Sequence, residues 1–196
     1  MSSDNKRPIK IMLSNRHAHI TKETSGILFG ENGLTFGGAP VTESSVGKAD
    51  GGISIIGPKG SIDNVRILLR YRKDNQVEIL QSDCFRLGIS APTRMSGCLE
   101  GAATIKLKGP CGEVESPCAI VAARHIHLLP EDAEKYGVKE GQVVKVRCGT
   151  NRSLVFENVV IELNTRVKHV GSVMHIDFEE GNAAGVKNGD YGEIIP

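Results

Sequence analysis

Hydrophobic residues along this chain fall in short runs that are separated by turns containing glycine and proline. The apolar or alternating runs occupy residues 9–14, 52–60, 64–72, 76–80, 103–112, 118–128, 142–148, 154–163, 171–177 and 191–196. Runs of this length, bounded by turn residues, predict β-strands. Because many strands follow one another closely, the pattern favours β-barrels over a parallel sheet with crossover helices.

Helices are predicted to be few and short. The segment 129–137, LPEDAEKYG, has a proline at its start, acidic residues in its first turn and a glycine after its end, which are signals of helix boundaries. The segment 81–88, QSDCFRLG, shows similar features, with Ser82 or Asp83 as its N-cap. A weaker third helix is predicted at 21–30.

Several short sequences occur twice in the chain. The pairs are GVKEG (137–141) and GVKNG (185–189), GPKG (57–60) and GPCG (109–112), and DNVRI (63–67) and ENVVI (157–161). The pattern Arg-His-x-His also occurs twice. We therefore expect a mainly β protein of two related β-barrels, each contributing half of a site at their junction.

Composition narrows the class of protein. The chain has 196 residues, of which 39% are hydrophobic and 24% are charged, as in ordinary globular proteins. The formal net charge of +1 does not predict nucleic acid or a membrane surface as a partner. No run of 18 apolar residues and no signal peptide is found. Five cysteines without a CxxC pair predict free thiols, and we expect a soluble, cytoplasmic protein.

The paired histidines are the strongest chemical signal. They stand in SNRHAHIT, as His17 and His19, and in AARHIHLL, as His125 and His127. Residues i and i+2 of a strand point to the same face, so each pair can bind one metal ion such as zinc. A single strand histidine is usually structural, but two such pairs favour a metal.

The remaining two histidines differ in their setting. His175, in VMHID, lies between apolar neighbours and is a further candidate ligand. His169 lies in a basic stretch, where an ordinary surface residue is the better interpretation. Cys98 and Cys111 do not stand in ligand-spaced pairs, and we expect both to be small buried hydrophobic residues.

The segment 70–80 is predicted to be a strand with two different faces. One face carries Arg72, Asp74, Gln76 and Glu78, and the other carries Val77 and Ile79. Two interpretations stay open from the spacing. The charged residues could form a surface ion pair of little energetic value, or a metal-binding carboxylate beside a phosphate-binding guanidinium.

Seven blocks together resemble the propanediol-utilisation type phosphate acyltransferases (phosphotransacylases) of bacterial microcompartments and their free relatives. The blocks are SNRHAHI, GPKGSIDNVRI, RKDNQVEI, LGISAPTRMSG, VAARHIHLLPEDAEKYGVKEGQVVKV, FENVVI and MHIDFEEGNAAG. The resemblance implies two β-barrels capped by short α-helices, with a two-zinc site between them. We expect one barrel to comprise residues 6–15 and 124–196. The other would comprise 16–123, with an excursion at about 30–50.

The resemblance also implies roles for individual residues. One zinc would be held by His17, His19 and Glu78, and the second by His125, His127 and His175. Arg72 matches the phosphate-binding arginine of the family. The positions that match CoA contacts are Leu13, Ser14, Asn15, Lys59, Arg66 and Asn182.

The implied reaction converts acetyl- or propanoyl-CoA and phosphate into the acyl phosphate and CoA. We expect direct attack by phosphate without an acyl-enzyme, because the sequence shows no activated serine or cysteine. The alternatives are a zinc-dependent thioester hydrolase and a non-catalytic acyl-CoA-binding protein. A homodimer is plausible, and acetate or propionate kinase is the expected pathway partner.

Some positions depart from the family pattern. Relatives usually carry threonine in place of Asn75 and serine in place of Leu80, and residues 164–173 are more basic than usual. Only about a dozen residues precede SNRH, whereas many microcompartment members carry a longer amphipathic extension. We therefore expect a free cytoplasmic enzyme rather than one in a microcompartment lumen.

Overall fold

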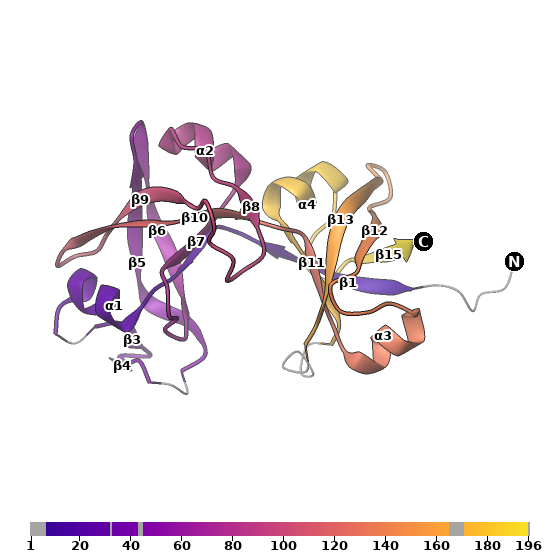
Figure 1. Cartoon of the computed structure of the whole chain (residues 1–196), viewed down its shortest axis with the longest axis horizontal. Coiled ribbons are helices and arrows are strands. Elements are labelled where there is room, and N and C mark those ends of the chain that lie inside the picture. The colour runs from indigo at the N-terminus through magenta and orange to yellow at the C-terminus, as the bar shows by residue number, and fades with distance from the viewer. Residues whose placement is uncertain (1–6, 32, 43–44, 165–170, 196) are drawn as a thin grey trace, which may run out of the picture. The chain divides into compact units, whose positions relative to one another are not determined.

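The structure, a computed structural model, describes residues 7–31, 33–42, 45–164 and 171–195 (Figure 1). His169 and residue 6 lie outside the described residues. Contacts divide the chain into two compact units, one of residues 15–122 and one of residues 1–14 with 123–196. None of the described helices is long and apolar enough to cross a membrane.

The unit of residues 15–122 is a closed barrel of six strands in the order β2-β6-β5-β9-β10-β7, in which β10 also pairs with the short strand β8. Its elements are β2 (His17–His19), α1 (Lys22–Phe29), β3 (Thr35–Phe36), β4 (Ala39–Pro40), β5 (Gly47–Gly57), β6 (Gly60–Leu69), β7 (Gln76–Ile79), α2 (Gln81–Leu87), β8 (Thr93–Arg94), β9 (Ala103–Lys108) and β10 (Glu113–Ala122). Figure 1 shows α1 and α2 at opposite ends of this barrel.

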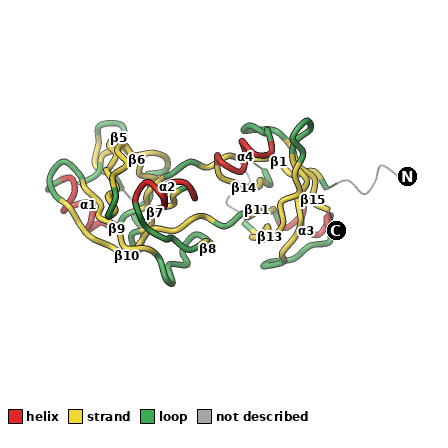
Figure 2. The backbone as a smooth tube through the Cα atoms, turned by 90° about the horizontal axis from the view of Figure 1, so that it is seen from above, coloured by secondary structure: helices red, strands yellow, loops and turns green. Residues whose placement is uncertain are grey.

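The other unit is a closed barrel of six strands in the order β1-β14-β11-β13-β12-β15. Its elements are β1 (Pro8–Ser14), β11 (His125–Leu128), α3 (Pro130–Tyr136), β12 (Val143–Cys148), β13 (Leu154–Leu163), β14 (Val173–Asp177), α4 (Phe178–Ala184) and β15 (Tyr191–Ile195). Figure 2 shows its strands in yellow and its helices, α3 and α4, in red. The prediction of a mainly β protein with two barrels and short helices is confirmed.

Both barrels have the same topology. The first consists of the half β2-α1-β5-β6 and the half β7-α2-β9-β10, and the second of β11-α3-β12-β13 and β14-α4-β15-β1. In every half, the first strand is parallel to the last. The first strands of the two halves pair antiparallel, as β2 with β7 and β11 with β14. The second barrel differs in taking its last strand, β1, from the opposite end of the chain.

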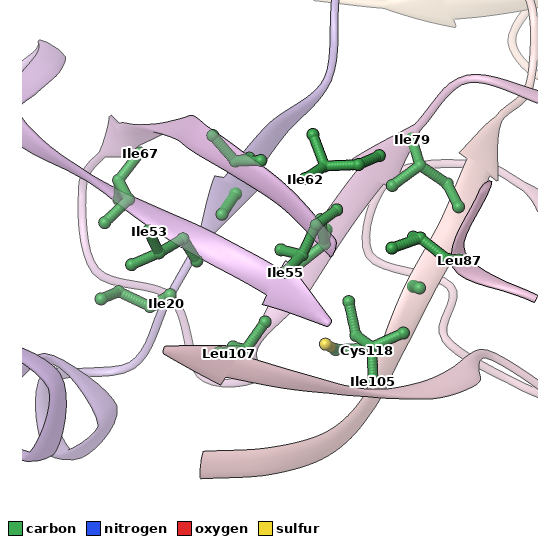
Figure 3. Packing of buried hydrophobic residues seen from close by; sticks show 14 of the residues in the cluster. Ile20, Ile53, Ile55, Ile62, Ile67, Ile79, Leu87, Ile105, Leu107 and Cys118 are labelled. Atoms are coloured by element: carbon green, nitrogen blue, oxygen red, sulfur yellow. The ribbon is translucent and has the colours of Figure 1, made fainter. Parts of the chain in front are cut away.

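Each barrel encloses its own core of branched apolar side chains. In the first, Ile55 and Leu107 are fully buried, and Figure 3 shows isoleucine and leucine side chains of β5, β6, β7 and β9 meeting inside the barrel. In the second, Val144, Val146 and Cys148 alternate with exposed residues along β12. This period of two is the one expected of a strand with one buried face.

The repeated GPKG and GPCG sequences form equivalent turns against helix ends. In the first turn, the Lys59 N–H donates to the Leu87 carbonyl of α2 at 3.0 Å; in the second, the Cys111 N–H donates to the Leu28 carbonyl of α1 at 3.0 Å. The helix backbone approaches so closely that a Cβ at Gly57 would lie 2.3 Å from the Leu87 oxygen. Each half of the barrel thus binds the helix of the other half.

Three local predictions differ from the structure. The run 118–128 is two strands, β10 and β11, which belong to different barrels. Helix α4 was not predicted, although Asp177 and Glu180 form a capping box that marks its start. The N-cap of α2 is Leu80, and Asp83 instead accepts the Leu80 N–H at 3.0 Å.

Candidate metal centres

The first histidine pair lies on β2, beside β7. His17 is in register with Glu78, and their Nε2 and Oε2 atoms are 3.4 Å apart. With His19, these residues form a group whose potential ligand atoms all lie within 4.8 Å of one another. Both histidines are buried and Glu78 is partly buried, so the cluster is largely shielded from solvent.

The hydrogen bonds of this cluster leave room for a cation. The Nδ1 atom of His17 lies 2.9 Å from the Asn15 carbonyl, which can only accept, so the lone pair of neutral His17 is on Nε2. That lone pair faces a carboxylate oxygen of Glu78 at 3.4 Å, and a shared proton or a metal ion would stabilise this arrangement of two acceptors. The Nδ1 atom of His19 is buried without a hydrogen-bond partner. These orphaned groups fit a metal ion.

Electrostatics favour neutral histidine at this position. Burial, with further contributions from Arg72 and His17, lowers the pKa of His19 to about 3. A neutral imidazole is the form that binds metals. His19 is therefore in the form that binds a metal at neutral pH.

The second cluster combines His125, His127 and His175. His125 is in register with His175 on the neighbouring strand β14, and the three ring centroids lie 4.8 to 5.1 Å apart. Their potential ligand atoms also lie within 4.8 Å of one another. Burial and the neighbouring His125 lower the pKa of His127, although Glu162 counteracts this.

The two clusters occupy equivalent positions in the shared topology. Each histidine pair lies on the first strand of one half, and the third residue, Glu78 or His175, lies on the first strand of the other half. The Nδ1 atom of His125 lies 2.9 Å from the carbonyl two residues earlier, as in His17. The repeated sequence motif thus corresponds to a repeated three-dimensional arrangement.

The arginine before each histidine pair also has an equivalent role. Arg16 binds both carboxylate oxygens of Asp83 at 2.8 and 2.9 Å, and Arg124 binds the carboxylate of Glu180. Each acid is the third residue of the helix that follows the strand of the third cluster residue. The sequence does not predict these two pairings, because they join positions that are 67 and 56 residues apart.

Arg72 lies in the loop before β7 rather than on the predicted strand, which begins only at Gln76. Its Nη1 atom donates to the Ser96 hydroxyl at 2.9 Å. Within the described part of the chain Arg72 forms no ion pair with a carboxylate. Burial of its head group lowers the pKa of Arg72, and the charge of Glu78 counteracts this effect. The residue as a whole is exposed to solvent, so an anion can reach its partly buried guanidinium.

The predicted CoA-contacting residues fall into two sets. In the first barrel, Arg66 is in register with His17, and its Nη2 atom lies 3.4 Å from the Asn15 carbonyl. Lys59 lies in the turn between β5 and β6, against Gly88, and none of its described contacts reaches the histidines.

The other set belongs to the second barrel. Leu13 and Ser14 end β1, and the Leu13 side chain lies against Gly181 of α4. The neighbouring residue, Asn182, lines an open pocket of about 760 Å³.

The cysteines correct one prediction. Cys98 and Cys111 are exposed, not buried, and neither belongs to a described metal-ligand group. All five cysteines are free thiols, as predicted.

Comparison with known proteins identifies the family. The sequence profile described as phosphate propanoyltransferase matches residues 10–187. A phosphate propanoyltransferase of Thermotoga maritima is 40% identical over 189 residues, which are 95% of this chain and 89% of the relative. One of Citrobacter koseri is 41% identical over 192 residues, which are 94% of this chain and 87% of the relative. The chain belongs to the phosphate propanoyltransferase family. Membership in the phosphate propanoyltransferase family supports phosphate acyltransferase activity with CoA as a substrate.

Proposed function

We propose that this chain transfers a short acyl group, acetyl or propanoyl, between CoA and phosphate, with zinc bound at both histidine clusters. The observation that carries the proposal is the pair of equivalent three-residue groups, each with its ligand atoms within 4.8 Å. Neutral imidazole nitrogens with one carboxylate suit zinc in coordination number and softness.

The metal ligands would be divided between the two clusters. His17, His19 and Glu78 would hold one ion, and His125, His127 and His175 the other. Three protein ligands leave one position of a tetrahedral site open. When bound, zinc would supply Lewis-acid polarisation of the thioester carbonyl and a soft partner for the CoA thiolate.

Arg72 would bind the phosphate. Its guanidinium has a neutral hydroxyl partner, Ser96, so its positive charge is not cancelled by an ion pair. The planar fork of arginine matches two oxygens of a phosphate. Holding phosphate in this way converts its attack on a bound thioester into an effectively unimolecular step.

The acyl transfer would proceed by direct attack. A phosphate oxygen forms a bond to the thioester carbonyl carbon, the carbon–sulfur bond breaks, and CoA leaves as its thiolate. No acyl-enzyme is required, and the exposed thiols, Cys98 and Cys111, do not belong to either cluster. Mass spectrometry of protein quenched during turnover tests this step: we expect no acylated cysteine, and finding one would contradict direct attack.

CoA would be bound by the residues that match the CoA contacts of the family. Lys59 and Arg66 would bind CoA phosphates as a point charge and a fork, respectively. The remaining contacts would come from Leu13, Ser14, Asn15 and Asn182. Replacing Arg66 with methionine should raise KM for acyl-CoA more than KM for phosphate.

The deciding experiment measures thiol release from acetyl-CoA and propanoyl-CoA, with and without phosphate, before and after treatment with a chelator. Release that needs both phosphate and metal supports the acyltransferase. Release without phosphate indicates a thioester hydrolase that uses zinc-bound hydroxide. No release from zinc-loaded protein that still binds acyl-CoA indicates a binding protein.

A further inference from the structure

Gln76 is a buried amide between the two chemical groups that the proposed function uses. It is the first residue of β7 and is only 1% exposed. It lies in register with His19 on β2. A buried polar side chain in such a position requires hydrogen-bond partners, and those of Gln76 connect Arg72 to Glu78.

All hydrogen-bonding positions of the Gln76 amide are engaged. Its Nε2 atom donates to Glu78 Oε1 at 2.8 Å and to the Ser96 hydroxyl at 2.9 Å. Its Oε1 atom accepts the Gly97 N–H at 2.7 Å and lies 3.4 Å from Arg72 Nη1. Because the carboxylate can only accept and the N–H groups can only donate, the orientation of the amide is determined.

The hydrogen bond from the Gln76 amide makes the two carboxylate oxygens of Glu78 different. Oε1 is occupied by the Gln76 N–H, whereas Oε2 faces His17 at 3.4 Å. Only Oε2 is therefore directed at the cluster. A neighbouring hydrogen bond of this kind orients a metal ligand and raises its affinity for the metal.

The same amide affects Arg72. Arg72 and Glu78 are close enough to influence each other electrostatically, yet they form no ion pair. If they did, the carboxylate would be drawn from the cluster and the guanidinium charge would be cancelled. Gln76 lies between them and offers each a neutral partner, an N–H for Glu78 and a carbonyl for Arg72.

We propose that Gln76 is a positioning residue that separates Arg72 from Glu78, and so keeps the carboxylate available to the metal and the guanidinium available to phosphate. This inference rests on the proposed function. It predicts that one substitution affects two properties, metal affinity and phosphate binding, that involve different residues.

The test replaces Gln76 with leucine, which has a similar size but no hydrogen-bonding groups. Zinc affinity is measured by competition with a chromophoric chelator in a His125→Ala background, which isolates the cluster of His17, His19 and Glu78. We expect an affinity loss of about 10- to 100-fold, as for other partners that orient metal ligands. In the chain with both clusters intact, KM for phosphate should rise about tenfold, while KM for acyl-CoA changes little.

Two further variants separate the connections. Ser96→Ala removes a partner of Arg72 and Gln76 that does not touch Glu78, so KM for phosphate should rise while zinc affinity is retained. Gln76→Glu keeps the shape of the side chain but places a negative charge between Arg72 and Glu78. It should impair phosphate binding more than Gln76→Leu does, and it keeps the proposal testable if the leucine variant fails to fold.

Asn75→Ala is the matched control. Asn75 is the preceding residue, but it binds Thr21 and Thr24 at α1, so its loss should leave both zinc affinity and KM for phosphate unchanged. If Gln76→Leu lowers only the unfolding temperature and leaves both quantities at wild-type values, Gln76 is merely structural and the inference is wrong. A wild-type protein without phosphate-dependent thiol release would instead contradict the proposed function, while the zinc measurement would still test the link to Glu78.

Discussion

The orientation of two histidine rings depends on nearby backbone carbonyls as much as on other side chains. The carbonyl of Asn15 holds Nδ1 of His17, and the carbonyl of Ala123 holds Nδ1 of His125. Both carbonyls belong to the residue two positions before the histidine. A substitution at these positions would change the side chain and leave this carbonyl in place. The backbone at the start of each strand therefore sets the orientation of the ring.

Thiol reactivity is a second property that is decided residue by residue. Cys98 and Cys111 are exposed, whereas Cys84, Cys118 and Cys148 are buried. Burial raises the pKa of Cys118 to about 12 and that of Cys148 to about 11, so almost none of the reactive thiolate is present at pH 8. We expect two thiols to react rapidly with a disulfide reagent in folded protein and all five after denaturation. Three rapid thiols in folded protein would contradict this assignment.

At the level of elements, ion pairs connect each histidine strand to a helix. Asp83 is buried and depends on Arg16 and the Leu80 N–H for its partners. Replacing Arg16 with methionine should destabilise the protein by about 2 kcal/mol, because a buried carboxylate loses its cation. The additional change Asp83→Asn should restore part of this loss, since asparagine still accepts the Leu80 N–H without a charge. Chemical denaturation measures both.

An exposed ion pair provides the control for this prediction. Lys106 and Glu113 pair at 2.7 Å on the surface, where solvent screens their attraction. Lys106→Met should therefore barely change the denaturation midpoint. If Arg16→Met changes it equally little, the pair with Asp83 is not a structural connection.

Alanine substitutions should have opposite effects on stability at the turn–helix contacts and inside helix α1. A Cβ at Gly57 would lie 2.3 Å from the Leu87 carbonyl oxygen, and one at Gly109 would lie 2.3 Å from that of Leu28. Gly57→Ala and Gly109→Ala should each destabilise the protein by about 2 kcal/mol through overpacking. Gly26→Ala, inside α1 with no atom within 4 Å, should instead stabilise it by about 0.5–1 kcal/mol. Thermal unfolding of the three variants measures these effects. Equal shifts in unfolding temperature for all three would contradict the close contacts.

The elements that could be predicted from the sequence are those with a local signal. Alternation over residues 143–148 and the proline and glycine around 130–137 are local, and β12 and α3 are found there. Helix α4 was missed because its capping residues follow an apolar strand without a break. The sequence predicts a single strand over residues 118–128 because nothing local marks Ala123 as the point where the chain passes from one barrel to the other.

The candidate site also combines features that the sequence predicts locally with features that it does not. The spacing of each histidine pair indicates that both rings share one strand face, and this is a local property. By contrast, the contact between Gln76 and Ser96 and that between Arg16 and Asp83 join residues that are 20 and 67 positions apart. Such contacts depend on strand register, which the sequence alone does not reveal.

For the whole molecule, the repeated topology predicts two metal ions per chain. His17→Ala should reduce bound zinc from two equivalents to one, and His125→Ala should have the same effect at the other cluster. Replacing both histidines should abolish binding. Elemental analysis after dialysis measures the equivalents, with His169→Ala expected to retain two. A loss of both ions from either single variant would show that the clusters do not bind independently.

During synthesis, β1 emerges from the ribosome long before the strands with which it pairs. Ser14 pairs with Asp177 and Pro8 with Glu193. Ile9 and Ile11 therefore have no strand partners while the barrel of residues 15–122 is synthesised. That barrel has all its strands once β10 has emerged, whereas the other closes only when β15 arrives. A nascent chain stopped between these points carries one finished barrel and one unpaired apolar strand, which is the kind of edge that chaperones bind.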